Sequence, residues 1–185
     1  CYSDLLTSDP IPPTSRLPFS KEEVKKVWEH QKEPWVDTVL ILLYSGWRIS
    51  ELLNLKPEDI NLKAGTMKGG TKTKAGKDRV VPIHSKIRPL VEARLAEGGP
   101  RLISYNGRAC SQTQYRVFWA DIMKALKINH TPHECRHTFE TQLDSAGANR
   151  KCIDLLMGHV SKDTGNRVYN HKTLDELKST VELIQ

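Results

Sequence analysis

Four residues in the C-terminal part of the chain have side chains that could together do chemistry at a phosphate. His133 and Arg136 stand three positions apart, so they share one face of a helix, and His159 and Tyr169 follow. Arginine binds phosphate oxygens through its forked guanidinium, histidine transfers a proton, and a tyrosine hydroxyl can attack as a nucleophile. The set still needs a second arginine and a proton donor from elsewhere in the chain.

Two short helices are expected to position these residues. The first begins at Pro132, with Thr131 as its cap, and ends before Gly147. Residues near its start therefore lie close to the positive end of the helix dipole, which favours an anion. The second helix spans residues 149–157 and delivers His159 just after its end.

The second arginine is expected from Arg48, in the first half of the chain. The pattern from 47 to 55 predicts a helix that follows the turn at Gly46 and ends at Pro57. Glu51 stands at i+3 from Arg48. That spacing also fits an ordinary helical ion pair of a few tenths of a kcal/mol, so both interpretations stay open.

Between residues 59 and 83 the spacing of the apolar residues changes from a helical to a strand-like period, which predicts β-strands around a glycine-rich connection. From Lys63 to Arg79 there are six basic residues and one acid, Asp78. The excess fits either a solvated hairpin tip, because lysine commonly protects sheet edges, or a basic finger along a nucleic-acid backbone. The residues assigned to DNA binding here are Lys68, Lys74, Lys77 and Arg79.

The remaining pattern is mostly helical, so the expected class is α+β, mainly α, with a small antiparallel β-sheet. Further helices are expected from Ser20, over 34–45, 85–97 and 111–126, and after Thr173. The proline-rich residues 1–19 are predicted to be a linker from a missing N-terminal domain. Residues 20–172 would form the catalytic domain, and 173–185 a C-terminal helix that docks on a neighbouring subunit or packs on its own core.

The composition favours a polyanionic partner, because the net charge is +6 and the pI is near 9.1. The four cysteines show no disulfide or C-x-x-C spacing, which predicts reduced thiols and a cytoplasmic location. No apolar run is long enough to span a bilayer, so no membrane partner is expected. A start at Cys1 without methionine predicts a chain excised from a longer protein.

Taken together, these segments resemble the catalytic domain of the tyrosine recombinases, the phage integrase family. The resemblance extends from about residue 17 to 183 and rests on five segments in the family's order. They are Gly46–Leu52, Lys72-Thr73 with Arg79–Ile83, His133–Phe139, Leu156–His159, and Tyr169 ten positions after His159. Cys135 departs from the leucine usual in the family.

The resemblance implies a site-specific DNA recombinase with a 3′-phosphotyrosine intermediate. The implied catalytic residues are Arg48, Lys72, His133, Arg136, His159 and the nucleophile Tyr169. It also implies that no metal, ATP or other cofactor is required. The implied partner is double-stranded DNA at specific recombination sites, bound by a homo-tetramer that could use an accessory directionality factor.

Three alternatives compete with this interpretation. A type IB topoisomerase-like enzyme would use a similar site to relax DNA without recombining it. His133-Glu134-Cys135-Arg136-His137 also matches H-E-x-x-H, the zinc metalloprotease pattern, although that pattern leaves Arg48 and Tyr169 unexplained. The third alternative is a DNA-binding module that has lost catalysis, but each expected catalytic position is filled.

Overall fold

The chain has a mainly helical α+β fold, in a computed structural model that describes residues 17–70, 77–159 and 173–185. The helices of these parts are α1 (Lys21–Glu29), α2 (Val36–Ser45), α3 (Ile49–Leu52), α4 (Arg88–Ala96), α5 (Gln112–Leu126), α6 (Pro132–Ser145), α7 (Arg150–Met157) and α8 (Leu174–Val181). The strands are β1 (Ile60–Asn61), β2 (Thr66–Gly69), β3 (Arg79–Pro82), β4 (Ser104–Tyr105) and β5 (Arg108–Ala109), with 3-10 turns η1 (Pro57–Asp59) and η2 (Ser85–Ile87). The expected class is confirmed.

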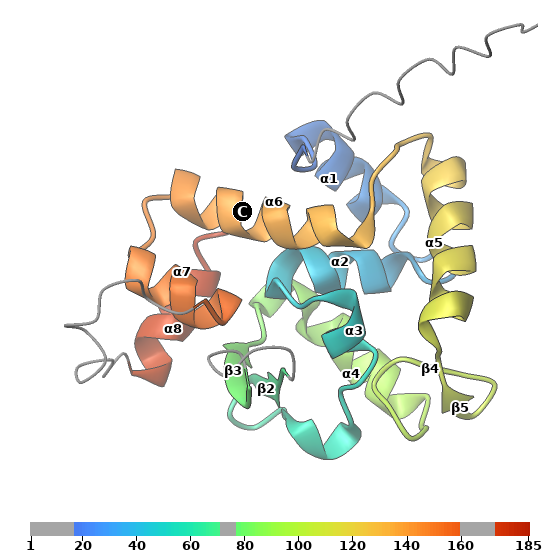
Figure 1. Cartoon of the computed structure of the whole chain (residues 1–185), viewed down its shortest axis with the longest axis horizontal. Helices are drawn as coiled ribbons and strands as arrows, with labels where there is room; N and C mark the ends of the chain where they lie inside the picture. Colours follow the sequence, from blue (N-terminus) through green and yellow to red (C-terminus); the bar gives the residue numbers. More distant parts are fainter. Residues whose placement is uncertain (1–16, 71–76, 160–172) are drawn as a thin grey trace, which may run out of the picture.

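Helix α2 forms the centre of the core, and α6 packs along it (Figure 1). Its sequence is apolar on nearly every side, which is typical of a helix surrounded by protein. Gly46 ends α2 with φ +64°, and a Cβ at this position would lie 2.4 Å from Cδ1 of Phe139 on α6. Glycine is therefore needed both for the left-handed turn and for the close approach of the two helices.

The predicted hairpin is part of a three-stranded antiparallel sheet in the order β1-β2-β3. In β2 and β3, Met67 pairs with Val81 and Gly69 pairs with Arg79. Met67 and Val81 are fully buried, so one face of the hairpin is anchored on the core. The segment between Gly70 and Lys77, which includes Lys72 and Lys74, lies outside the described residues.

Side-chain caps define several helix starts that the sequence predicted. The hydroxyl oxygens of Ser20, Ser111 and Thr173 each accept a backbone N–H three positions later, and the glutamate or glutamine there bonds back. Asn149 caps α7 by accepting the N–H of Lys151 at 2.9 Å. These starts are local in origin, because both partners lie within one turn of chain.

The helix predicted for residues 47–55 is much shorter in the structure, where α3 contains only Ile49–Leu52. Arg48 has extended backbone angles, φ −71° and ψ 147°, and its N–H donates to Oε2 of Glu51 at 3.0 Å. Arg48 therefore precedes the helix instead of lying inside it. The helix also ends earlier than predicted, because the N–H groups of Asn54 and Leu55 donate to the carbonyls of Glu51 and Leu52, three positions back, in place of helical i→i−4 bonds.

The C-terminal helix α8 packs on its own chain, against α7 and β3. Leu177, Val181 and Ile184 supply its buried face. The end of the chain is also held by hydrogen bonds, because the ring of His84 contacts the carbonyl oxygen of Ile184 at 2.9 Å and Tyr44 donates to that of Gln185 at 3.2 Å. Within the described residues, no helix has both the length and the apolar character needed to cross a bilayer.

Candidate active site

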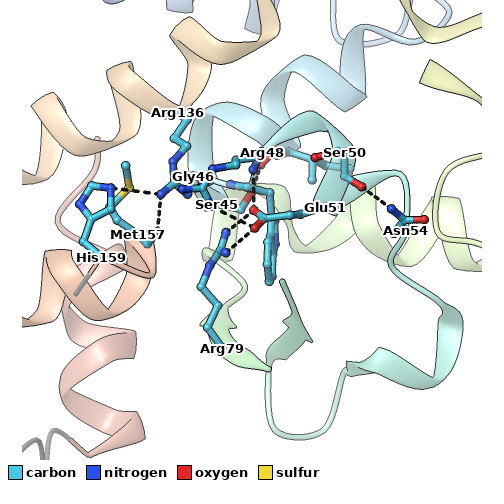
Figure 2. Close-up of polar contacts among 12 residues, drawn as sticks. Ser45, Gly46, Arg48, Ser50, Glu51, Asn54, Arg79, Arg136, Met157 and His159 are labelled. Carbon is cyan, nitrogen blue, oxygen red and sulfur yellow. Dashed lines mark hydrogen bonds and ion pairs between the residues drawn. The ribbon is translucent and has the colours of Figure 1, made fainter. Parts of the chain in front are cut away.

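Arg136 lies at the junction of three helices and is buried there, with 3 % of its surface exposed. From α6, its Nη1 donates to the carbonyl oxygen of Gly46 at 2.6 Å, and its Nη2 donates to that of Met157 (Figure 2). These carbonyls stand at the ends of α2 and α7, where helices leave acceptors without internal partners. Arg136 is consequently held in one position by backbone atoms of both neighbouring helices.

His159 is placed beside Arg136 by the turn that ends α7. Gly158 takes the left-handed conformation, φ 63°, and the N–H of His159 donates to the carbonyl of Asp154 at 2.9 Å. Nε2 of His159 then lies 3.4 Å from Nη2 of Arg136. Because arginine has no acceptor, Nε2 is the accepting nitrogen in this contact and the ring proton is on Nδ1.

The pKa of His159 is lowered from its ordinary value, by burial first and then by the charge of Arg136. Arg48 lowers it further, whereas Glu140 and Asp154 oppose the effect. At neutral pH the imidazole is therefore uncharged, in agreement with its role as an acceptor from Arg136. A bound anion would reverse the sign of the local field and favour the protonated ring.

Arg48 is held at the site by Glu51, and Glu51 is shared with a second arginine. Nη1 of Arg48 donates to Oε1 of Glu51 at 3.0 Å. Arg79 makes a two-point contact with the same carboxylate, Nη1 to Oε1 at 3.0 Å and Nη2 to Oε2 at 2.8 Å. Figure 2 shows these arginines converging on the Glu51 carboxylate from opposite sides. The contact between Arg48 and Glu51 noted in the sequence is thus one half of a buried cluster.

The site carries an excess of positive charge. The pKa of Arg136 is lowered to about 9, by burial first and then by the charges of Arg48 and Arg79, while Glu51 and Glu140 oppose the shift. A guanidinium so disfavoured by its neighbours gains stability when an anion binds. The arrangement can therefore bind a phosphate group strongly.

The predicted residues differ in where the structure places them. Arg48, Arg136 and His159 come together, and His133 is exposed in the first turn of α6. Lys68 and Lys77 are exposed on the hairpin, as a DNA-binding role requires. The predicted residues Lys72, Lys74 and Tyr169 lie outside the described residues.

Arg79 is the predicted DNA-binding residue that the structure places differently. Its side chain is 3 % exposed and its guanidinium stacks 4.1 Å from the ring centre of Trp47. It therefore does not lie on the surface with Lys68 and Lys77. The prediction for Arg79 rested on its place in a basic run, and it could not include a carboxylate 28 positions away.

Glu51 is the residue of the site that sequence reasoning left undecided. Its spacing from Arg48 was a signal, but the spacing alone fits an ion pair on any helix surface. In the structure the Glu51 side chain is 1 % exposed. A carboxylate so deeply buried requires cationic partners, which distinguishes it from an ordinary surface pair.

The zinc-protease alternative requires His133 and His137 to bind one metal ion, with Glu134 beside it as a base. Both histidines are exposed, but Glu134 is buried and belongs to the start of α6. Its Oε2 accepts the N–H of Thr131 at 2.9 Å and lies 2.8 Å from Nδ1 of His130. Among the residues that the structure describes, no group of three or more His, Cys, Asp or Glu side chains could hold a metal.

Comparison with known proteins agrees with this geometry. The sequence pattern of the phage integrase family matches residues 19–176. The chain belongs to the phage integrase family. The matched range contains Arg48, Arg136, His159 and Tyr169. The family resemblance seen in the sequence is therefore confirmed.

Curated relatives of this family member are tyrosine recombinases. The chain is 34% identical over 193 residues to tyrosine recombinase XerA of Pyrococcus furiosus, covering 97% of this chain and 66% of the relative. It is 35% identical over 148 residues to tyrosine recombinase XerC of Pelobacter propionicus, covering 75% and 48%. The chain thus spans between about half and two thirds of the length of these relatives.

Solved structures share the fold of this integrase-family chain. A crystal structure of XerA recombinase has a TM-score of 0.69 and 25% identity, covering 91% of this chain and 65% of that one. The Tn1549 transposon integrase in complex with circular intermediate DNA has a TM-score of 0.69 and 22% identity, covering 93% and 66%. At this level of identity the second similarity concerns the fold alone.

Proposed function

We propose that the chain is the catalytic domain of a site-specific DNA recombinase, an integrase that cuts and rejoins DNA through a 3′-phosphotyrosine. The observation that carries this proposal is the convergence of Arg48, Arg136 and His159, from three separate parts of the chain, on one positively charged site. Membership of the phage integrase family supports the same activity. The substrate is double-stranded DNA at specific recombination sites.

The two arginines bind the non-bridging oxygens of the scissile phosphate. A guanidinium donates through a planar fork, and negative charge increases on these oxygens as the phosphorus becomes pentacoordinate. Arg136 is already fixed by Gly46 and Met157, so little reorganisation accompanies binding. His159 adds a hydrogen bond to a phosphate oxygen. To donate this bond, the ring either turns its Nδ1–H toward the oxygen or becomes protonated on Nε2.

Tyr169 is the proposed nucleophile. A phenol has an ordinary pKa of about 10, so attack requires a base, and His133 is proposed to take the proton. The bond from the tyrosine oxygen to phosphorus forms as the bond from phosphorus to the 5′-oxygen breaks. Lys72 is proposed to donate a proton to that oxygen, which leaves as a 5′-hydroxyl.

Rejoining reverses these steps with another strand. A 5′-hydroxyl attacks the phosphotyrosine and releases Tyr169, so the energy of the original phosphodiester is retained and neither ATP nor a metal is proposed. Exchange between two duplexes is proposed to occur in a homo-tetramer on DNA, with an accessory directionality factor as a further partner. A cytoplasmic location is proposed, because the described cysteines Cys110, Cys135 and Cys152 are free thiols.

A nicked suicide substrate tests this function. The protein is incubated, in EDTA, with a pool of nicked duplexes of randomised sequence, from which the short 3′ fragment diffuses after cleavage. Covalent protein–DNA adducts are isolated on a denaturing gel, and their sequences identify a preferred duplex. The proposal expects an adduct that forms in EDTA and is lost in Tyr169→Phe.

Tyr105→Phe is the matched control, because this tyrosine is 38 % exposed on the β4–β5 hairpin and has no proposed role. The control should form the adduct at the unchanged rate. An adduct that persists in Tyr169→Phe would show that another residue is the nucleophile. Joining of two labelled duplexes, in addition to relaxation of supercoils, separates a recombinase from a topoisomerase-like enzyme.

A further inference from the structure

Arg79 has a position that neither its sequence context nor the reaction scheme explains. It belongs to the basic hairpin, yet its guanidinium is enclosed between the ring of Trp47 and the carboxylate of Glu51. Its Nε is buried and has no hydrogen-bond partner in the described part of the chain. The charge of Arg79 is therefore directed into the molecule, toward Glu51.

The base of the hairpin is fitted to this arrangement. Arg79 pairs across the sheet with Gly69. A Cβ on Gly69 would lie 2.8 Å from Cδ2 of Leu55 and 3.4 Å from Cη2 of Trp47, so the strand passes directly over these side chains. A side chain at Gly69 would thus meet Leu55 and Trp47, and Arg79 on the neighbouring strand stacks on the ring of Trp47.

Glu51 receives more from Arg79 than from Arg48. Arg79 supplies two guanidinium hydrogen bonds, at 3.0 and 2.8 Å, in the forked geometry that binds carboxylates strongly. Arg48 supplies one guanidinium bond at 3.0 Å in addition to its backbone N–H. Burial raises the pKa of Glu51, but Arg79 first, and Arg48 to a smaller extent, outweigh burial and lower it.

The charges of this cluster have a simple consequence for Arg48. Arg79 and Glu51 form a neutral pair, so Arg48 keeps a positive charge that no described carboxylate fully balances. Without Arg79, the buried carboxylate of Glu51 would be balanced by Arg48, which already donates to it, and these two charges would neutralise each other. An arginine neutralised in this way has much less attraction left for phosphate.

We propose that Arg79 is a positioning residue for DNA cleavage, which neutralises Glu51 and so leaves the guanidinium of Arg48 available to the scissile phosphate. This inference rests on the proposed function. It assigns Arg79 an indirect action through Glu51 and Arg48, with no contact to the DNA. Removal of the Arg79 charge should therefore slow cleavage much more than it weakens DNA binding.

The test compares the rate of adduct formation on the selected duplex, the affinity for that duplex and the thermal stability. In Arg79→Met we expect a rate about 10²-fold lower, the size of effect seen when one transition-state donor is lost, with affinity within about threefold. Arg79→Lys keeps the charge but loses the forked contact, so its rate should lie between those of the unchanged protein and Arg79→Met. Glu51→Gln combined with Arg79→Met removes both charges and should be at least about tenfold faster than Arg79→Met.

A role in packing alone predicts otherwise. If the double variant is no faster than Arg79→Met, or if Arg79→Lys is as slow as Arg79→Met, the proposal is wrong. Should Arg79→Met not fold, the rate of adduct formation by Arg79→Lys is the test, and a loss of about 10²-fold or more in that variant contradicts the proposal. If adding Glu51→Gln to Arg79→Met restores part of the lost rate, the proposal is supported. If the added change slows cleavage further, the proposal is contradicted.

Arg116→Met is the matched control, because it removes an arginine that is exposed on α5 and has no proposed role. Its rate should stay within about twofold of the unchanged protein. The outcome also separates this inference from the proposed function. No Tyr169-dependent adduct from the unchanged protein contradicts the function, whereas a normal adduct from both that protein and Arg79→Met contradicts this inference alone.

Discussion

The guanidinium of Arg136 donates through Nη1 to the carbonyl oxygen of Gly46, 2.6 Å away at the end of α2. Its second donor reaches the carbonyl of Met157 at the end of α7. One side chain thereby satisfies acceptors that two helices leave unpaired at their C-terminal ends. The proposed phosphate-binding residue is also a structural link among α2, α6 and α7.

Arg136→Lys should consequently damage both stability and cleavage. Lysine keeps the charge but cannot reach both carbonyls, so a buried acceptor loses its partner at a cost of about 1–3 kcal/mol. We expect the free energy of unfolding in denaturant to fall by that amount and adduct formation to become very slow. Arg150→Lys is the control, because Arg150 is 55% exposed and should change stability by less than about 0.5 kcal/mol. Equal stability of Arg136→Lys and the unchanged protein would contradict the structural link.

Sulfate binding should depend on pH through Arg136. Its pKa is lowered to about 9 by burial and by the charges of Arg48 and Arg79, so the free site loses this charge as the pH rises through that value. Sulfate stays a dianion over this range. Calorimetric titration should show an affinity that decreases by up to about tenfold per unit as the pH rises above 9. The same decrease in Arg136→Met would assign the titration to another group.

Stability should decrease in weak acid because of His84. Burial lowers the pKa of this histidine below its unfolded value, outweighing the opposing hydrogen bond to Ile184 and charge of Glu182, while Lys86 adds to the lowering. The unfolded chain then binds a proton more readily than the folded chain. The stabilisation is complete above about pH 6.5, the unfolded pKa, and is lost as the pH falls from there through the folded pKa.

His84→Gln tests this dependence, since a glutamine amide can still donate toward the carbonyl of Ile184. Chemical denaturation between pH 7.5 and 5 should show a loss of stability in the unchanged protein that is smaller in the variant, where His159, whose pKa is also lowered, still contributes. His137→Gln, at an exposed position of α6, serves as the control and should keep the full dependence. If both variants follow the unchanged protein, the pH dependence arises elsewhere.

Gly46→Ala should be costly, because φ is +64° and the new Cβ would meet Phe139 at 2.4 Å. The left-handed backbone costs about 1–2 kcal/mol and overpacking a further 1–3 kcal/mol. Gly147→Ala is a close comparison, since φ is +74° but no heavy atom lies within 4 Å of its Cβ. Gly147→Ala should therefore lose only the about 1–2 kcal/mol of stability that the left-handed backbone costs. Thermal and denaturant unfolding of the pair would refute the packing argument if both changes cost the same.

Several features were predictable from sequence because their causes are local. Capping pairs such as Ser20 with Glu23 lie within one turn of chain, so the start of α1 follows from neighbouring residues. Gly46 was expected to end α2, and it does so in a left-handed conformation. The segments around Arg48, Arg136 and His159 were recognisable for the same reason, because each is a short run whose residues act together.

The tertiary structure decided what depends on partners far apart in sequence. Arg79 was expected on the DNA-binding surface, but Glu51, 28 positions earlier, holds it inside. His84 had no assigned role, yet it binds the carbonyl of Ile184, 100 positions later. Burial of a charge or a polar ring is tolerated only where a partner compensates for lost water. The sequence by itself therefore determined which groups could do the chemistry, and folding decided which of their charges remain available for it.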